Sequence, residues 1–288
     1  MSTPPTVLVT GAGRGIGRAV AEAFADAGWS VVAGVRDLER AEADLADRPG
    51  IVPVHLDVTD PESVRTAVAD AERRAGGGLD CVVSNAGYAV LGAVEDVDLD
   101  EVRRMFETNF FGAAAVVQAA VPAMRAAGRG SVVFVSSVGA RFANPLVGMY
   151  HASKFALSAM AEALALECRP FGVHVACVEP GMVDTDFPRA TRPTGSLGRG
   201  EGPYLPLLGE LRAGFGAWRE RNPTPPSEVA DLVLAAALDP AGPFRVPAGE
   251  DAEFLTRTRQ ELSDAEWQDA LLGFLQIDWP RGAGDASS

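Results

Sequence analysis

The stretch Thr10-Gly11-Ala12-Gly13-Arg14-Gly15-Ile16-Gly17 decides the fold class of this sequence. It follows the β-branched run 7–10, which is typical of a buried strand, and opens the segment 16–27, whose apolar residues recur at helical spacing. Glycines between a strand and a helix allow a tight turn and let the backbone approach a diphosphate at the helix N-terminus. Because Ile16 fills the place of the last glycine in G-x-G-x-x-G, the pattern is G-x-x-x-G-x-G. The stretch predicts a dinucleotide-binding loop with contacts from Gly11, Gly13, Arg14, Gly15, Ile16 and Gly17.

Segments typical of strands and helices alternate along the rest of the chain. Apolar, β-branched runs predict strands at residues 30–35, 51–56, 79–84, 131–136, 173–178 and 244–246. Helical spacing predicts helices at residues 61–74, 99–124, 150–169, 227–238 and 252–275. Apolar strands separated by helices form a parallel sheet that is covered on both faces. We therefore predict an α/β fold of Rossmann type, a doubly wound parallel sheet of about seven strands with its ligand crevice at the carboxyl ends of the strands.

The character of the sequence changes after the sixth predicted strand. Residues 187–226 carry seven prolines, seven glycines and scattered large apolar residues. This composition predicts an irregular segment, which within a compact domain is typical of a functional lid. We call residues 187–226 the lid segment and expect its aromatic and leucine side chains to form an apolar wall of a substrate pocket. We predict a single domain over residues 1–281 and a flexible tail at residues 282–288.

The lid segment also has an unusual charge. It carries six arginines against three glutamates, a balance of +3 in a chain of net charge −14. One interpretation is a solvated loop. The other is recognition of a phosphate or carboxylate, for example on a carrier-tethered acyl substrate. Both interpretations stay open at the level of sequence.

Composition and charge bound the classes of function. The chain has 288 residues, of which 47% are hydrophobic, and its net charge of −14 argues against nucleic-acid and anionic-membrane partners. Residues 1–6 lack a basic and apolar leader, and the apolar stretch 110–124 is shorter than the ~20 residues that a membrane span requires. Three cysteines are too few for a disulfide framework. We expect a soluble, cytoplasmic protein without a membrane or nucleic-acid partner.

A metal site is not expected. Cys168, His174 and Cys177 are the residues that suggest one. His174 and Cys177 are three positions apart in a predicted strand, so their side chains point to opposite faces of the sheet.

The end of the second predicted strand, Gly34-Val35-Arg36-Asp37, bears on the choice of cofactor. An acidic residue about 20 positions beyond the last glycine binds the ribose 2′-hydroxyl of NAD, and Asp37 lies at that distance. We give more weight to Arg36, because Val35 occupies the strand tip, where an acid would repel a 2′-phosphate. Arg36 and Arg14 together offer two guanidinium groups to a phosphate dianion. The sequence therefore predicts NADP(H).

A candidate catalytic pair opens the helix predicted at 150–169. Tyr150-His151-Ala152-Ser153-Lys154 contains the only lysine of the chain, whose other 24 basic residues are arginines. Residues i and i+4 share one helix face, so the phenol of Tyr150 and the ammonium of Lys154 project together. A nearby ammonium lowers the pKa of a phenol from its usual value near ~10, which allows proton exchange with a carbonyl or alcohol oxygen. Ser137 follows the strand predicted at 131–136, where its hydroxyl can bond the same oxygen.

These motifs together resemble the short-chain dehydrogenase/reductase family. They occur in the family's order over residues 10–185: the glycine loop, Asn85-Ala86-Gly87, Asn109 in Asn-Phe-Phe-Gly, Ser137, Tyr150-x-x-x-Lys154 and 180–185, Pro-Gly-Met-Val-Asp-Thr. The resemblance implies that Tyr150 donates or accepts the proton, and that Lys154 lowers its pKa and holds the nicotinamide ribose. It implies that Ser137 steadies the substrate oxygen and that Asn109 helps to hold a water that relays protons to Lys154.

The resemblance also implies cofactor contacts outside the glycine loop. It places Asp57 and Val58 beside the adenine and Asn85, Ala86 and Gly87 along the cofactor. It places a further loop at the nicotinamide, with Val183 and Thr185 at the carboxamide: Pro180, Gly181, Val183 and Thr185. The family often has asparagine where this chain has Ser84, which concerns local strand–helix detail only.

Three stretches, 35–38, 56–61 and 244–252, are similar to the branch that includes steroid and retinol dehydrogenases. The resemblance implies NADP(H)-dependent hydride transfer to or from a carbonyl or secondary alcohol of a mainly apolar small molecule, and we expect a ketoreductase. The alternatives are an oxidative dehydrogenase of a steroid- or retinoid-like alcohol and a nonenzymatic NADP(H)-binding sensor. A sensor is expected to have lost Tyr150 or Lys154, and both are present. The resemblance further implies a homodimer or homotetramer built on the helices near 99–124 and 150–169.

Overall fold

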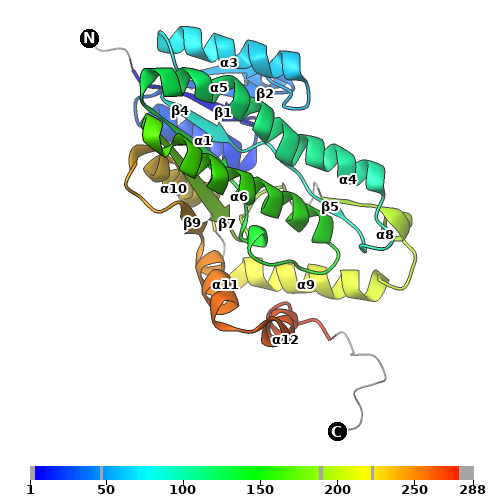
Figure 1. Cartoon of the computed structure of the whole chain (residues 1–288). Coiled ribbons are helices and arrows are strands. Elements are labelled where there is room, and N and C mark those ends of the chain that lie inside the picture. Colours follow the sequence, from blue (N-terminus) through cyan, green and yellow to red (C-terminus); the bar gives the residue numbers. More distant parts are fainter. Residues whose placement is uncertain (1–3, 46–47, 188–190, 222–223, 279–288) are drawn as a thin grey trace, which may run out of the picture.

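A seven-stranded parallel sheet forms the centre of the computed structural model, which describes residues 4–45, 48–187, 191–221 and 224–278 (Figure 1). The strand order is β3-β2-β1-β4-β6-β7-β9, and all neighbours run parallel. The strands are β1 (Thr6–Thr10), β2 (Ser30–Val35), β3 (Ile51–His55), β4 (Cys81–Ser84), β6 (Gly130–Val135), β7 (Val173–Pro180) and β9 (Arg245–Ala248). The strand order reverses at β1, and ligands bind at the carboxyl ends of strands beside such a reversal. The doubly wound Rossmann-type fold predicted from the sequence is confirmed.

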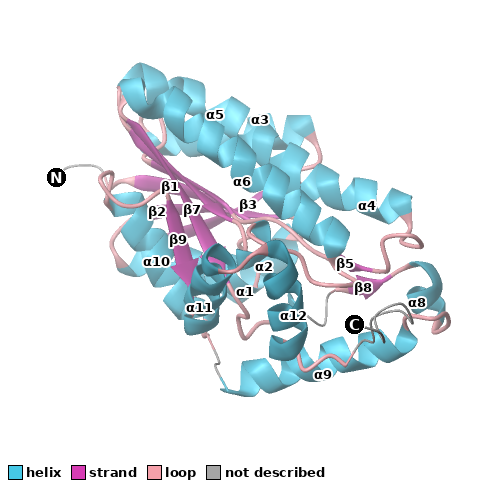
Figure 2. Cartoon of the chain, turned by 60° about the horizontal axis from the view of Figure 1, so that its bottom comes forward, coloured by secondary structure: helices cyan, strands magenta, loops and turns pink. Residues whose placement is uncertain are grey.

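Helices cover both faces of the sheet (Figure 2). One face carries α1 (Gly15–Asp26), α2 (Leu38–Leu45) and α10 (Pro226–Leu238), and the other carries α3 (Pro61–Ala75), α5 (Ala113–Ala127) and α6 (Gly148–Cys168). Along β1, Val7 and Val9 belong to the first core and Leu8 to the second, because successive side chains of a strand point to opposite faces. Since both faces of the sheet are covered, the strands are mostly apolar, and this pattern made them recognisable in the sequence.

The helix predicted at 99–124 contains an irregularity that the sequence did not indicate. Helix α4 (Leu99–Phe106) continues through a π-helical segment, Glu107–Gly112, into α5. A Cβ built on Gly112 would lie 2.7 Å from the Val58 side chain, so the helix touches the loop after β3 at this point. Extra residues in a helix as π-bulges are common at functional sites, and this one contains Asn109.

The continuous helical run Leu99–Ala127 is longer than the apolar stretch 110–124 considered in the sequence. With 29 residues it meets the length and composition of a membrane-spanning helix, a test that a core helix of a soluble protein also passes. One third of its most apolar window is buried, and Val116, Ala120 and Met124 belong to the core beneath the sheet.

The prediction of an irregular lid segment is wrong for most of its described part. The segment forms β8 (Arg192–Pro193), which pairs with β5 (Val90–Leu91), then α8 (Gly195–Arg199) and α9 (Leu205–Arg221). Residues 188–190 and 222–223 lie outside the described residues. Leu207, Leu208 and Leu211 bury the apolar side of α9 against Leu146 and Trp267. Tertiary burial outweighs the low helix propensity of glycine here.

One glycine of α9 has a packing reason. A Cβ on Gly214 would lie 2.0 Å from the Leu275 carbonyl oxygen, so this close approach of α9 to the C-terminal segment requires glycine. The same C-terminal region corrects another prediction, because the helix predicted at 252–275 is divided into α11 (Glu250–Glu261) and α12 (Asp264–Phe274). The division is stabilised by a capping box between Ser263 and Glu266. The predicted tail at 282–288 lies outside the described residues.

Candidate active site

The glycine loop between β1 and α1 has the backbone that a dinucleotide requires. Gly11 and Gly15 adopt positive φ angles of 68° and 55°, which favour glycine. A Cβ on Gly17 would lie 2.3 Å from the Gly11 carbonyl oxygen, so the turn closes only with glycine there. Arg14, the N-cap of α1, makes no side-chain cap, and the first turn of α1 holds no acidic residue. The free amide groups of this turn therefore suit an anionic diphosphate.

Thr10 and Asn85 hold this loop against the end of β4. The Asn85 Nδ2 donates to the Thr10 carbonyl at 2.9 Å, and the backbone N–H groups of Asn85 and Ala86 donate to the Thr10 Oγ1 at 2.9 and 3.0 Å. The sequence predicts Asn85 and Ala86 as cofactor contacts. In the structure they also support the glycine loop through their hydrogen bonds with Thr10. Thr10 was not singled out, although its place before the first glycine was a usable signal.

Two arginines flank the glycine loop, Arg36 directly after β2 and Arg14 directly before α1. The side chains of Arg14 and Arg36 are exposed and form no ion pair or hydrogen bond within the described residues. Val35 is buried, with 4% of its surface exposed, and a Cβ on Gly13 would lie 3.6 Å from it. The donor set fits a phosphate on the adenosine ribose, because two guanidinium groups are available and the strand tip is uncharged.

Asp57 and Val58 lie in the loop after β3. The Asp57 Oδ1 accepts hydrogen bonds from the Thr59 N–H and hydroxyl at 2.9 and 2.8 Å. The Asp57 N–H donates a hydrogen bond to the Ser63 hydroxyl. Burial works to raise the pKa of Asp57, but these bonds and the charge of Arg36 outweigh it and lower that pKa below its ordinary value. Asp57 and Arg36 therefore face the same region at the carboxyl ends of β2 and β3.

Tyr150, Lys154 and Ser137 come together where β6 ends and α6 begins. The Tyr150 side chain shares a hydrogen bond with Ser137, and the Lys154 Nζ lies 6.0 Å from the centre of the Tyr150 ring. Ser137 ends its strand in extended conformation, and its Oγ accepts the Gly139 N–H at 3.0 Å. Lys154 is 5% exposed and donates to the Val135 carbonyl at 3.0 Å. No second acceptor for this ammonium occurs among the described residues, so it retains donors for ribose hydroxyls.

The pKa of Tyr150 corrects one expectation. Burial raises this pKa to about 12, against a smaller lowering by the Ser137 hydrogen bond. Burial lowers the pKa of Lys154 to about 8. The predicted lowering of the phenol pKa by the ammonium is therefore wrong, because desolvation disfavours both charged forms. At neutral pH the Tyr150 phenol is therefore protonated and lies beside a mostly protonated Lys154.

Asn109 is the centre of a buried hydrogen-bond chain in the π-helical segment. Its Oδ1 accepts the Tyr88 N–H at 3.0 Å, and its Nδ2 donates to the Tyr88 carbonyl at 2.9 Å and the Ser153 hydroxyl at 3.0 Å. The Ser153 hydroxyl donates to the Tyr150 carbonyl at 2.7 Å. A Cβ on Gly87 would lie 3.1 Å from the Asn109 Oδ1 and 3.7 Å from the Lys154 Nζ. The Asn109 side chain thus positions the Tyr88 backbone and α6, and the water relay implied by the resemblance stays a prediction.

His151 ties the Ser137 loop to the helix that carries Tyr150, a role that sequence reasoning missed. Its Nδ1 pairs with the Gly139 carbonyl at 2.8 Å, and a Cβ on Gly139 would lie 2.2 Å from the same nitrogen. The ring is 5% exposed, and its buried Nε2 has no hydrogen-bond partner among the residues that the structure describes. Burial lowers the pKa of His151 to about 4, against a smaller raising by the Gly139 bond.

Protonation of His151 is expected to make stability depend on pH. Its folded pKa of about 4 lies below the ordinary value of 6.5, so the unfolded chain binds the proton first as the pH falls. The free energy of unfolding is therefore fully retained above pH 6.5 and declines between pH 6.5 and 4, by about 3 kcal/mol in total. Chemical denaturation of the wild type and His151→Asn across this range measures the effect. Parallel pH profiles for the two proteins contradict the prediction.

The loop after β7 is held from the C-terminal side by Asp251, another residue that the sequence analysis did not name. Asp251 is 2% exposed, and its carboxylate accepts the Met182 N–H at 2.7 Å and the Ala252 N–H at 2.8 Å. Burial raises its pKa. A Cβ on Gly181 would lie 2.2 Å from this carboxylate, so Gly181 permits the contact. Thr185 lies against the glycine loop, since a Cβ on Gly15 would be 3.6 Å from its methyl group.

A buried ion-pair network joins the same loop to Ser137. Glu179, fully buried next to Pro180, accepts from the Arg141 Nε at 2.9 Å and from the Arg245 Nη1 at 2.8 Å. Arg141 follows the Ser137 turn, and Arg245 belongs to the stretch 244–252. That stretch therefore supports the site through Arg245 and Asp251. Phe187, at the start of the lid segment, packs 5.8 Å from the Tyr150 ring between ring centres.

Residues that suggest a metal do not converge. No group of three histidine, cysteine or acidic residues placed to hold a metal ion occurs in the described part of the chain. Cys168 and Cys177 are buried free thiols, and Cys177 contacts the Ser158 hydroxyl.

Several known proteins resemble this chain in sequence and in fold. The family model described as short chain dehydrogenase matches residues 5–195. The 3-ketodihydrosphingosine reductase of Bacteroides thetaiotaomicron is 32% identical, with 95% of this chain and 99% of that protein covered. The crystal structure of a short-chain dehydrogenase from Streptomyces avermitilis is 34% identical and superposes with a TM-score of 0.78 over 95% of this chain and 99% of that one. A short-chain dehydrogenase from Burkholderia cenocepacia in complex with NADP is 28% identical, with a TM-score of 0.72 over 97% of this chain and 100% of that one.

Proposed function

The chain belongs to the short-chain dehydrogenase/reductase family, and it is therefore an oxidoreductase that acts on CH–OH groups. From this premise we propose that it is an NADP(H)-dependent ketoreductase. The observation that carries the proposal is the meeting of the Tyr150 phenol, Ser137 hydroxyl and Lys154 ammonium beside the glycine loop. A relative named for reduction of a ketone, at 32% identity over nearly its whole length, supports this direction.

The chemistry assigned to the side chains follows from their protonation. The cofactor, when bound, would supply a hydride for the carbonyl carbon from its reduced nicotinamide. Tyr150, whose pKa of about 12 keeps the phenol protonated at neutral pH, donates a proton to the carbonyl oxygen. Ser137 bonds the same oxygen, and the Lys154 ammonium stabilises the phenolate left on Tyr150 and binds the nicotinamide ribose. A protonated phenol suits reduction better than oxidation, because oxidation requires Tyr150 to begin as the base.

The choice of NADP(H) over NAD(H) is supported by the ends of β2 and α1. Arg14 and Arg36 are exposed without carboxylate partners within the described residues, and Val35 places no charge at the strand tip. The Burkholderia cenocepacia relative was solved with NADP. The proposed preference also favours reduction, because cells usually keep the NADP(H) pool reduced.

We also propose a cellular location, a type of substrate and an oligomeric state for the enzyme. We place it in the cytoplasm, acting on a small, mainly apolar carbonyl compound, without a nucleic-acid or membrane partner. A homodimer or homotetramer built on the run Leu99–Ala127 and on α6 is supported by exposed apolar side chains on these helices, Phe111, Phe155 and Leu166. The size of the purified protein in solution tests this part.

A panel of ketones, aldehydes and secondary alcohols tests the function. We expect NADPH absorbance to fall with apolar ketones, and NADH to support turnover at least about tenfold more weakly. Alcohol oxidation that exceeds ketone reduction at neutral pH contradicts the proposed direction. Cofactor binding without turnover of any compound contradicts the enzyme itself.

A further inference from the structure

We propose that Arg212 and Arg219 of helix α9 form an anion-recognition face that selects substrates carrying a carboxylate or phosphate group. The inference rests on the proposed ketoreductase function and names the substrate class of that site. It assigns a binding role to the basic side of the lid segment, which the sequence left open between a solvated loop and a recognition element.

The two arginines share one flank of α9. They are seven residues apart, so at 100° per residue their side chains point within about 20° of each other. Leu211, fully buried, marks the apolar side of the helix. On one flank of that side, Gly214 meets the Leu275 carbonyl and the Glu210 carboxylate accepts the Asp278 N–H at 2.8 Å. Arg212 and Arg219 lie on the other flank, away from the C-terminal segment.

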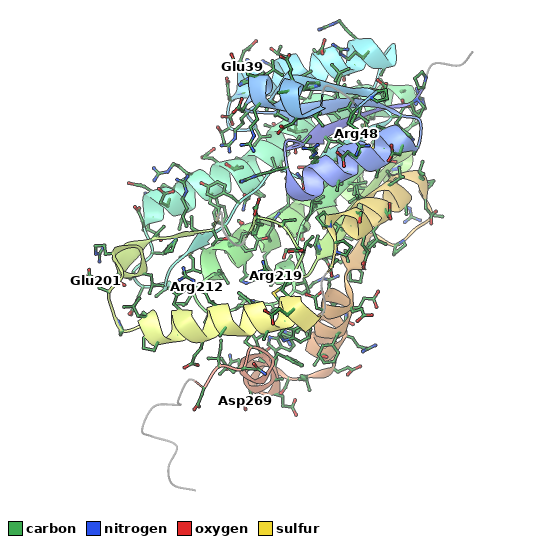
Figure 3. All side chains as sticks on the ribbon, turned by 180° about the vertical axis from the view of Figure 1, so that it is seen from behind. Glu39, Arg48, Glu201, Arg212, Arg219 and Asp269 are labelled. Carbon is green, nitrogen blue, oxygen red and sulfur yellow. The ribbon has the colours of Figure 1, made fainter. Side chains whose placement is uncertain are left out.

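That flank faces the sheet. Figure 3 shows Arg212 and Arg219 rising from α9 on the side of the central domain, whereas α12 lies on the opposite side of α9. Leu207 and Leu208 of α9 belong to the same apolar cluster as Val138, which follows Ser137, and Val147, which precedes α6. Phe187 anchors the start of the lid segment on the Tyr150 ring. Helix α9 therefore borders the candidate site through its leucines, and its two arginines lie on the side of the helix that faces the central domain.

Their charges are unpaired within the described residues. Arg199 of the same segment pairs with Glu201 at 2.5 Å, whereas Arg212 and Arg219 form no ion pair or hydrogen bond among the residues that the structure describes. Of the acidic residues of α9, Glu210 is bonded on the other flank and Glu220 lies about 100° round the helix from Arg219. Arginine forms strong, two-pronged hydrogen bonds with carboxylates and phosphates.

The negative net charge of the whole chain affects how an anionic substrate can reach the site. A net charge of −14 repels anions in general, so local unpaired cations are needed to draw an acidic substrate to the site. The anion has two possible sources, an acidic substrate or the phosphates of the cofactor. We assign the substrate, because the proposed function already gives the cofactor phosphates their own partners in Arg14, Arg36 and the amides at the start of α1.

The test compares acids with their neutral analogues. Straight-chain keto acids of increasing length and their methyl esters are reduced with NADPH by the wild type, Arg212→Ala, Arg219→Ala and the double variant. We expect the wild type to prefer acids of one chain length, and the acid-to-ester ratio of kcat/KM to fall about tenfold for each arginine removed, chiefly through KM for the acid. Raising the ionic strength is expected to lower the same ratio in the wild type.

Arg169 offers a matched control. It is exposed, has no ion pair within the described residues and lies just before the amino end of β7, far from the crevice. Arg169→Ala is expected to leave the acid-to-ester ratio unchanged. Equal effects of Arg169→Ala and Arg212→Ala on that ratio overturn the proposal, since only the net charge would then matter.

The outcomes separate this proposal from the proposed function. Esters reduced as well as acids at every chain length overturn the anion face and leave the ketoreductase intact. A rise in KM for NADPH that is the same with acids and esters assigns the arginines to the cofactor and overturns the substrate assignment. Absence of turnover with all ketones and esters overturns the proposed function, and the inference falls with it.

Discussion

Tyr150→Phe is expected to lower kcat for ketone reduction by a factor of about 100 to 10,000, because it removes the hydroxyl that donates a proton to the carbonyl oxygen. The ring stays in place, where it packs against Phe187 and His151, so the fold and the glycine loop are not disturbed. NADPH binding, measured by fluorescence titration, is expected to stay within about twofold of the wild type. Steady-state kinetics with a ketone found in the panel measures the loss.

Tyr204→Phe is the matched control for this experiment. This variant also removes one phenolic hydroxyl, but from the lid segment, where the Tyr204 hydroxyl donates to the carboxylate of the exposed Glu95 at 2.9 Å. We expect its kcat to stay near that of the wild type. Comparable activity of Tyr150→Phe and Tyr204→Phe contradicts the proton-donor role of Tyr150.

Val35→Asp is expected to shift the ratio of kcat/KM for NADPH over NADH by about 100-fold toward NADH. The new carboxylate stands at the tip of β2 beside Gly13, where it repels a 2′-phosphate and can accept hydrogen bonds from the ribose hydroxyls of NADH. It also lies next to Arg36 in sequence and offers that guanidinium an internal partner. Kinetics with both cofactors at one fixed ketone concentration measures the ratio.

Val35→Asn separates charge from packing in this test. Val35 belongs to the apolar core on the α1 side of the sheet, so both variants place a polar group at a buried position and lower stability. Only the aspartate adds a negative charge. An unchanged cofactor ratio in Val35→Asp, or an equal shift in Val35→Asn, refutes the electrostatic basis of the NADP(H) assignment.

Much of the site could be predicted because its parts are local in sequence. Tyr150 and Lys154 are one helical turn apart, so their meeting needed only the helix. The glycine loop is a single turn whose positive φ angles and close contacts are met by Gly11, Gly15 and Gly17. Contacts between distant segments could not be predicted in this way. His151 pairs with Gly139, and Asp251 with Met182, because of how α6 and α11 pack.

The structure of the lid segment also could not be predicted from patterns of neighbouring residues. Its prolines and glycines indicate a loop when each residue is considered alone, and the structure contains helix α9 because Leu207 and Leu211 find an apolar partner surface. The pKa of Tyr150 was misjudged for a related reason. Spacing along a helix shows that a cation is near, but the surrounding burial that raises this pKa to about 12 is a property of the packed site.

The amino-acid sequence by itself determined the doubly wound sheet, the dinucleotide loop and the Tyr150–Lys154 pair, since strand burial, turn glycines and helical spacing are patterns of neighbouring residues. Only the tertiary structure decided which distant groups hold the site, such as His151, Glu179 and Asp251, and which protonation states burial imposes on it. It also decided that Arg212 and Arg219 lie on the side of α9 that faces the central domain. The physical reason is that desolvation and contacts between segments far apart in the chain exist only after the helices have packed on the sheet.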